Sequence, residues 1–182
     1  MTLTQLEDLF WRATIMCLGL DPDSADESVQ KRVRISWPSS DTGSSNWQRE
    51  ENVVFLRISP AIDSFTDLID VSHNYDTETN QLREIVQYYR CYQIHWVCYG
   101  PQSDVDADII RIGILRNAVH TYLMQHNVAV KPHIREAMRT TEQDETGEWW
   151  ERHDLTCECY ILVSRAYDVG HVDSPPDINI NL

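Results

Sequence analysis

Residues 84–99 read EIVQYYRCYQIHWVCY, and this stretch decides the fold. Alternate positions form a series that is apolar or aromatic apart from one arginine: Val86, Tyr88, Arg90, Tyr92, Ile94, Trp96 and Cys98. The intervening series is mixed in polarity: Ile85, Gln87, Tyr89, Cys91, Gln93, His95 and Val97. Such alternation is typical of an antiparallel strand that covers a core with one face. We therefore predict a long strand over Glu84–Tyr99 that ends at Gly100-Pro101.

An amphipathic helix is predicted directly after this strand, from about Asp104 to Gln125. Apolar residues recur there at three- and four-residue steps, which predicts one buried stripe. The predicted stripe consists of Val105, Ile109, Ile112, Leu115, Val119, Tyr122 and Leu123. Ser103 and Asp106 resemble a capping box in which Asp replaces Glu, so the helix should begin there.

Shorter elements complete the predicted fold. A first helix covers Leu3–Leu18, with Thr2 or Thr4 as its cap, and Gly19 ends it. Further strands are predicted at Val33–Trp37, about Asn52–Ser59, Val128 toward Met138, and Trp149–Arg165. Ile62–Tyr75 fits either a strand and turn or an irregular excursion. The order of elements predicts an α+β fold: a single domain with a central antiparallel β-sheet, flanked by the N-terminal helix and the long amphipathic helix. The domain should cover residues 1–167, and residues 168–182 should form an extended tail.

The charge balance restricts the possible partners. The chain of 182 residues carries 29 Asp and Glu against 15 Lys and Arg, a net charge of −14. A protein that grips phosphates needs clustered positive charge, and the basic run Lys31–Arg34 is too short to supply it. Tight DNA binding is therefore disfavoured, whereas surrounding DNA without holding it is compatible with the charge. No apolar run reaches membrane-spanning length, and five cysteines without a secretory signal indicate a reduced, cytosolic setting.

Catalytic and metal-binding patterns do not match the sequence. Counted from Asp104, an EF-hand loop would need Gly and Glu where Ile109 and Leu115 stand. Cys157 and Cys159 lack the two-residue gap and the second ligand pair of a zinc site, so core packing explains them better. The chain contains no His-Glu-x-x-His element, nucleophile elbow or glycine-rich phosphate loop. We expect no enzyme, no cofactor and no metal.

Two segments are candidate contact regions. Trp47 lies in a polar loop, where a tryptophan is either an exposed contact residue or a partly buried anchor. The C-terminal residues include Asp177, Ile178 and Ile180 in an alternating, extended stretch. Such a tail is either loose or able to add a strand to a neighbouring subunit.

Four segments taken together carry a resemblance to a known family. They are Ile35-Ser36-Trp37-Pro38 after the first helix, Asn52–Ile58, Cys91–Pro101 running into the long helix, and Trp149-x-x-Arg152-x-Asp154-Leu155. In this order they resemble the neck or tail-terminator proteins of tailed bacteriophages, over residues 3–167.

The resemblance implies a structural subunit of a virion. Proteins of this kind form a ring, usually of six copies, that ends the tail tube and joins it to the head connector. The implied partners are further copies of the chain, the tail tube protein and the connector or adaptor protein, with double-stranded DNA passing through the lumen. The implied location is the neck of a virion assembled in the host cytoplasm, with no membrane contact. No active-site residue carries over.

Two other functions stay open on the sequence alone. The first is a head-completion or adaptor protein that docks on the portal, which would share the acidic surface and the loops. The second is a small cytosolic hydrolase or transferase, which would need a constellation such as His95 near Cys157.

Overall fold

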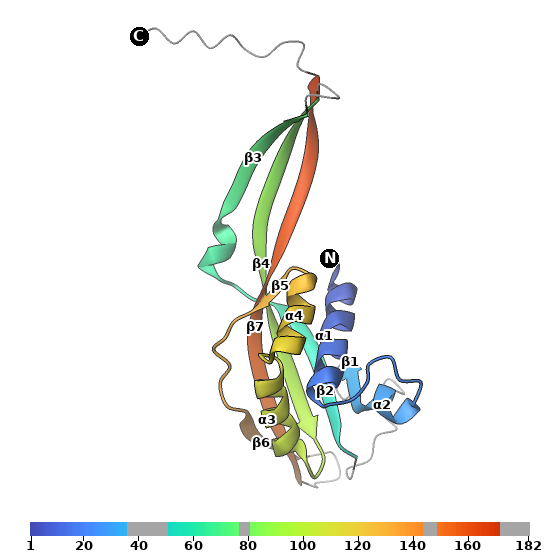
Figure 1. Ribbon diagram of the computed structural model, residues 1–182. Helices are drawn as coiled ribbons and strands as arrows, with labels where there is room; N and C mark the ends of the chain where they lie inside the picture. The colour runs from blue at the N-terminus through green and yellow to red at the C-terminus, as the bar shows by residue number, and fades with distance from the viewer. Residues whose placement is uncertain (36–50, 77–80, 144–148, 172–182) are drawn as a thin grey trace. The chain divides into compact units, whose positions relative to one another are not determined.

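Strand β4, Gln81–Tyr99, is central to the sheet. The computed structural model describes residues 1–35, 51–76, 81–143 and 149–171, and among them seven strands form one sheet. The other strands are β1 Val33–Ile35, β2 Val53–Pro60, β3 Ile69–Asp76, β5 Val128–Val130, β6 Met138–Gln143 and β7 Trp149–His171. Their order is β1-β2-β4-β7-β5, with β3 beside β4 and β6 beside β7 (Figure 1). β1 and β2 are parallel, while β2 and β3 run antiparallel to β4, and β5 and β6 antiparallel to β7. The α+β class with a mostly antiparallel sheet is confirmed.

The chain divides into two compact units. The first, which we call the helical unit, comprises Met1–Ile62 and Cys91–Ile161. The second, which we call the three-stranded unit, comprises Asp63–Arg90 and Leu162–Leu182 and contains β3 with parts of β4 and β7. Strands β4 and β7 therefore contribute residues to both units. The predicted division into a domain over 1–167 and a tail over 168–182 stays a prediction.

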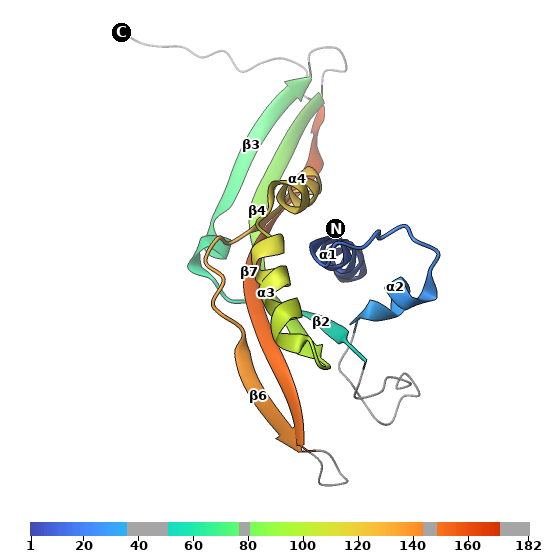
Figure 2. The same ribbon diagram turned by 60° about the horizontal axis from the view of Figure 1, so that its bottom comes forward.

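Helices α1, α3 and α4 pack on one face of the sheet in the helical unit (Figure 2). Their bounds are α1 Leu3–Cys17, α3 Ser103–Gly113 and α4 Asn117–Gln125, and a short helix α2 covers Glu27–Arg32. Thr2 caps α1 through a capping box with Gln5, as the sequence allowed. Gly19 follows with a φ of 75°, a conformation that glycine adopts without steric cost.

The main core lies between these helices and the sheet. It is built around fully buried large side chains, which include Trp96, Phe10, Leu6, Ile15, Leu56, Ile94, Ile110, Ile114, Leu123 and Leu155. The rings of Phe10 and Trp96 meet edge to face with centroids 6.3 Å apart. A second buried cluster on the opposite face of β2 and β4 holds Val53, Phe55, Val97 and Tyr99. The two-sided burial explains why β2 is almost continuously apolar.

The single long helix predicted over Asp104–Gln125 is wrong, because α3 ends at Gly113 and α4 begins at Asn117. Gly113 lies so close to α1 that a Cβ atom there would be 2.8 Å from the Cβ of Cys17. The predicted capping box is also wrong. Gln102 is the N-cap of α3 without a side-chain hydrogen bond, and Asp106 instead bonds to Arg32.

The predicted buried stripe of this region is wrong on α3 and right on α4. Val105, Ile109, Ile112 and Leu115 are exposed, whereas Ala107, Ile110 and Ile114 are buried. Helix α3 carries apolar residues on two sides, so the spacing fits either stripe. The side with the smaller residues Ala107 and Gly113 allows the closer approach to neighbouring elements. On α4, Val119 and Leu123 are buried and Tyr122 packs partly buried against the core, as predicted.

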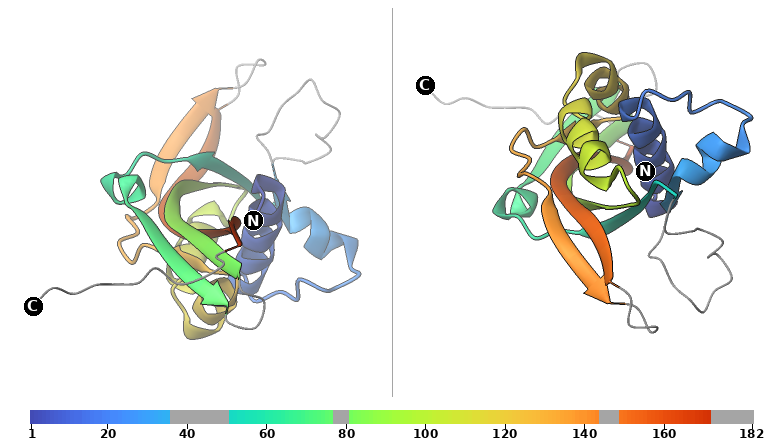
Figure 3. Two further views of the ribbon diagram at one scale, coloured as in Figure 1. Left: turned by 90° about the horizontal axis from the view of Figure 1, so that it is seen from above. Right: turned by 90° about the horizontal axis from the view of Figure 1, so that it is seen from below.

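The remaining segments refine the predicted boundaries. Within Ile62–Tyr75 the structure forms a 3-10 turn, η1 Ser64–Asp67, and then β3, so the strand alternative holds for its second half. Helix α2 was not predicted; Asp26 caps it by accepting a hydrogen bond from the Ser28 N–H. Strand β6 lies beside the first part of β7 (Figure 3), separate from β5, and β7 continues to His171.

Candidate assembly surfaces

The three-stranded unit has one apolar face. In the register of β3 with β4, Ile69 lies opposite Tyr88, Val71 opposite Val86, and Tyr75 opposite Leu82. Directly opposed residues of an antiparallel pair share a face, and successive residues alternate between faces. These six side chains therefore lie on the same side of the unit. Between them, His73 and Glu84 form an ion-pair contact at 3.5 Å.

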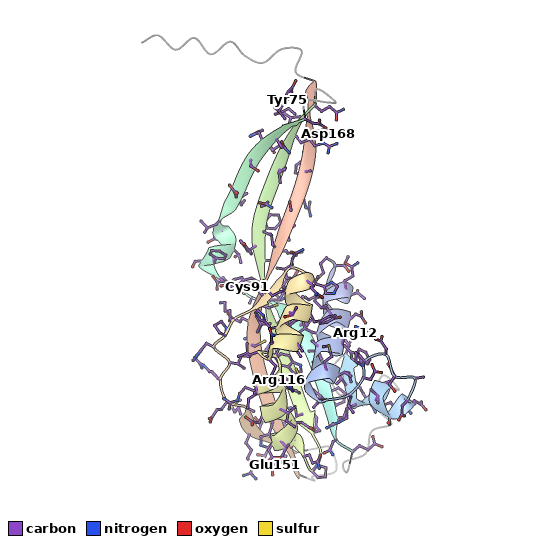
Figure 4. All side chains as sticks on the ribbon, viewed as in Figure 1. Arg12, Tyr75, Cys91, Arg116, Glu151 and Asp168 are labelled. Carbon is purple, nitrogen blue, oxygen red and sulfur yellow. The ribbon has the colours of Figure 1, made fainter. Side chains whose placement is uncertain are left out.

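Strand β7 extends this apolar face. The hydroxyls of Tyr167 and Tyr88 lie close to the Arg165 guanidinium, and they raise the pKa of Arg165. Arg165 and Tyr167 therefore lie on the side of Tyr88. By alternation, Val163 and Val169 lie there too. Tyr75 and Asp168, both labelled in Figure 4, lie at the same end of the unit.

The opposite face of the unit is largely polar. Arg83 contacts Asp168 at 3.3 Å, and the Gln87 amide donates to the Ser164 hydroxyl at 3.5 Å. The other β3 residues on this face are Asp70, Ser72, Asn74 and Asp76. The ring of Phe65 in η1 packs on Tyr89 with centroids 4.9 Å apart, so the aromatic residue of this face is partly covered. The two faces thus differ in composition, although Ile85 also lies on the polar face and His73, Glu84 and Arg165 lie on the apolar one.

The apolar face is exposed. Ile69 is 65% exposed, Val71 49% and Val169 52%, and Tyr75 and Tyr167 are exposed as well. A two-faced strand pattern normally covers its apolar side with other parts of the protein. A contiguous apolar surface that remains open is characteristic of a contact surface for another molecule. We call this set of residues, from Ile69 to Val169, the apolar sheet face.

A second apolar surface lies on the outer side of α3 in the helical unit. The exposed Val105, Ile109 and Ile112 are spaced by three or four residues and form one stripe along α3, and the exposed Leu115 follows just beyond the end of the helix. Beside this stripe is a concavity of about 490 Å³ lined by Arg111, Ile112, Leu115, Arg116, Pro132 and Ile134. Among the residues that the structure describes, two arginines and no carboxylate line it, and Arg111 also bonds to the exposed Asp108 at 3.0 Å. We call the stripe and the concavity together the α3 surface.

A larger concavity of about 570 Å³ in the helical unit has mixed charge. Its lining includes Lys131, His133, Arg135, Glu136 and Glu158. The Lys131 ammonium pairs with the Glu158 carboxylate at 2.5 Å and lies 4.8 Å from the centre of the Tyr160 ring. Lys131 and Glu158 neutralise each other and the rest of the lining carries both signs of charge, which gives the concavity no obvious ligand preference.

The constellation that a hydrolase would need is not assembled. The ring nitrogens of His95 contact the hydroxyls of Ser59 at 3.4 Å and Thr156 at 3.2 Å. Cys157 is the neighbour of Thr156 in β7 and points into the main core, on the other side of the strand. Burial raises the pKa of the Cys157 thiol well above its usual range, whereas a nucleophilic cysteine needs a lowered pKa. Burial and the nearby Arg57 lower the pKa of His95.

The structure places the other candidate residues of the sequence as follows. All five cysteines are free and buried, as core packing predicted. Asp106 is buried and forms an ion pair with Arg32, and Asp108 forms an ion pair with Arg111. Trp47, Asp177, Ile178 and Ile180, the predicted contact residues, lie outside the described residues. Sequence reasoning identified the α3 stripe and the apolar side of β4 but assigned both to the core, so it did not predict that they are exposed.

Comparison with known proteins identifies the family. The model of a family described as phage neck terminator protein matches residues 4–181, nearly the whole chain. No curated protein matches the chain closely enough to count as a relative. Within the described ranges, no helix combines the length and the apolar character that crossing a membrane requires. The chain therefore belongs to the phage neck terminator protein family, a structural and not an enzymatic family whose place is the virion.

Proposed function

We propose that the chain is the subunit of a ring, of six copies, that ends the tail tube at the phage neck and joins the tail to the head connector. Its partners are then further copies of itself, the tail tube protein and the connector protein. The family assignment supports a neck role. The observation that carries the proposal is the exposed apolar sheet face, because a subunit that works alone would not keep such a face open to water.

The charge of the chain fits the passage of DNA through the ring. A net charge of −14 opposes attachment of the phosphate backbone. A neck ring has to let the genome move through its centre, so a surface that does not hold DNA is useful. Fluorescence anisotropy of labelled double-stranded DNA should therefore show no binding by the protein at physiological salt. Binding at micromolar protein would contradict a passive channel.

The ring is tested by native mass spectrometry together with negative-stain microscopy of the purified protein. Both measurements are made alone and in the presence of tail tubes. Six-copy rings with an open centre, free or on tube ends, are expected. A protein that stays monomeric at high concentration and also ignores tubes would end the proposal.

Cross-linking in assembled particles separates the proposal from a portal-docking adaptor. Links to the last ring of tube protein are expected of a terminator, and links confined to portal subunits would assign the adaptor role. Trp47, Asp177, Ile178 and Ile180 stay predicted contact residues. Substitution of Trp47 by alanine should weaken ring or tube binding without unfolding the protein.

A further inference from the structure

We infer that neighbouring copies join edge to edge through the three-stranded unit, where β7 of one copy pairs in parallel with β3 of the next. This inference rests on the proposed ring and names the contact that closes it. The contact is made by backbone hydrogen bonds along two strand edges. It extends both faces of the sheet and covers neither the apolar sheet face nor the α3 surface.

The three-stranded unit has the strand order β3-β4-β7, with β4 in the middle (Figure 1). Gln87 of β4 lies opposite Asp70 of β3 and contacts Ser164 of β7 at 3.5 Å, so the outer strands flank β4 on its two sides. β3 runs antiparallel to β4. Arg83, earlier in β4 than Gln87, contacts Asp168, later in β7 than Ser164, so β7 also runs antiparallel to β4. The two outer strands therefore run in the same direction.

Both outer strands have an open edge. Among the residues that the structure describes, β3 pairs with β4 alone, and β5 and β6 pair with β7 no further along than Ile161. Every residue of Ile69–Asn74 and of Ser164–Val169 is exposed, whereas most of β4 between them is half-buried. An edge strand directs a row of backbone N–H and C=O groups outward, and another strand can bind them.

These two edges lack the features that protect an edge strand from pairing. Proteins protect such strands by shortness, by proline or lysine, and by bulges. β1 and β5, at the two ends of the main strand order, have only three residues each, whereas β3 has eight. The register of β3 with β4 is uninterrupted over all eight residues, so β3 contains no bulge. Neither β3 nor Leu162–His171 contains a proline or a lysine.

The two faces of the unit determine how the edges meet. Copies that align their apolar sheet faces keep Val71 and Tyr167 on one side of the joined sheet and Ser72 and Ser164 on the other. A flipped copy would place apolar side chains beside polar ones across the new pair. When face and strand order are both kept, β7 and β3 meet in parallel. The chain already uses this kind of pairing between β1 and β2.

A second copy of this chain fits both edges at once. Pairing β7 with β3 uses two different edges on every copy, so the contact repeats from copy to copy and closes into a ring when the rotation allows it. Pairing β3 with β3 would instead give a closed dimer and leave the edge of β7 open. Only the first arrangement satisfies the outward backbone groups of both strands in every subunit.

Hydrogen exchange followed by mass spectrometry measures this backbone contact directly. Wild-type rings, free or on tube ends, are compared with monomers obtained by dilution. Peptides covering Ile69–Asn74 and Ser164–Val169 should exchange about tenfold more slowly or slower still in the rings, because pairing turns outward amides into hydrogen-bonded ones. β6, Met138–Gln143, is an outer strand of the helical unit and serves as the internal control. Its exchange should be the same in both states.

Single cysteines test the partner and the direction. Because all five native cysteines are buried, introduced thiols are the accessible ones. Copies with one β3 cysteine are mixed with copies with one β7 cysteine, all on the polar face: Asp70→Cys, Ser72→Cys or Asn74→Cys with Ser164→Cys, Ala166→Cys or Asp168→Cys. A short bis-maleimide should link β3 to β7. The favoured β7 position should rise as the β3 position rises, as parallel strands require.

The outcomes separate the inference from the proposed function. Rings without slower exchange at the two edges, or without links from β3 to β7, would overturn this contact and leave the ring intact. Links between two Ser72→Cys copies would assign β3 to a dimer contact, and a favoured β7 position that falls as the β3 position rises would assign antiparallel pairing; either result overturns the inference. A wild type that never assembles, with or without tubes, would overturn the proposed function and this inference together.

Discussion

Asp106 accepts a hydrogen bond from the Arg32 guanidinium at 2.5 Å, and this ion pair joins α3 to the end of α2. Only 5% of the Asp106 side chain and 18% of the Arg32 side chain are exposed. Two residues further along α3, Asp108 bonds to Arg111 while 58% of its side chain is exposed. The same helix thus contains a buried and an exposed version of one interaction.

The first prediction compares these two aspartates. Asp106→Asn should lower the free energy of unfolding by about 3 kcal/mol, because it leaves the Arg32 charge buried without a counter-charge. Asp108→Asn should lower it by less than about 1 kcal/mol, because water screens the exposed pair. Urea denaturation followed by tryptophan fluorescence measures both. Equal losses would mean that burial does not govern the strength of these pairs.

A second prediction concerns the polar link inside the main core. The Trp96 indole N–H donates to the Thr14 hydroxyl at 2.9 Å, and that hydroxyl donates to the Phe10 carbonyl at 2.7 Å. Thr14→Val keeps the shape but leaves the indole N–H without an acceptor, which should cost about 1–3 kcal/mol. Thr14→Ser keeps the oxygen and should cost about 1 kcal/mol for the lost methyl group. If the serine variant were the less stable one in thermal unfolding, methyl packing and not the hydrogen bond would dominate.

A third prediction separates two glycines with positive φ. Gly19 has a φ of 75° and open space around it, whereas a Cβ on Gly100 would lie 2.5 Å from the Glu51 carbonyl oxygen. Gly19→Ala should therefore cost only the conformational penalty, about 1 kcal/mol. Gly100→Ala adds a collision with backbone and should cost about 3 kcal/mol in total. Differential scanning calorimetry of the two variants checks the order, and a more damaging Gly19→Ala would refute it.

A fourth prediction follows from the buried thiols. Burial raises the pKa of Cys17 from its ordinary value of 9.0 to about 12. Between these values the unfolded chain releases this proton while the folded chain keeps it, so the free energy of unfolding falls as the pH rises. From pH 8 to about 10.5 the wild type should lose about 2 kcal/mol more than Cys17→Ala, at roughly 1.4 kcal/mol per pH unit.

The control for the fourth prediction is thiol labelling at neutral pH. Ellman's reagent should react with the native protein slowly and with the unfolded protein fully, because all five cysteines are buried. Rapid native labelling, or identical pH dependence in wild type and Cys17→Ala, would contradict the burial of this thiol in solution.

Periodicity predicted the elements whose two sides differ clearly. The alternation around Trp96 correctly indicated β4. The inner face predicted for β7 consists of Leu155, Cys157, Cys159, Ile161 and Val163, of which the first four are buried and Val163 is only partly buried. The pattern also identified α1, where Leu6, Leu9, Phe10, Ala13 and Cys17 of the predicted face are buried. Ile15, outside that face, is buried as well, and Leu3 is exposed.

The same reasoning failed where a helix is apolar on two sides. Val105, Ile109 and Ile112 fit a buried stripe as well as Ala107 and Ile110 do, and only the tertiary approach of α1 to Gly113 decides between them. Likewise, the alternation in β4 indicates that its apolar side is to be covered, but it carries no information on what covers it. The two exposed apolar surfaces are therefore features that reasoning from the sequence assigned to the core.

Strands β4 and β7 pass from the helical unit into the three-stranded unit without interruption. A one-residue slip of either strand would turn Trp96 or Cys159 away from the core, so the core also dictates which residues lie on the apolar sheet face. The core fixes which side each residue of β4 and β7 faces, but it does not fix how many residues these strands contribute to the three-stranded unit. Adding or removing two residues in each strand changes its reach by about 7 Å and keeps every side chain on its own side. Insertions or deletions of even size in β4 and β7 would thus lengthen or shorten the three-stranded unit with no change in the core.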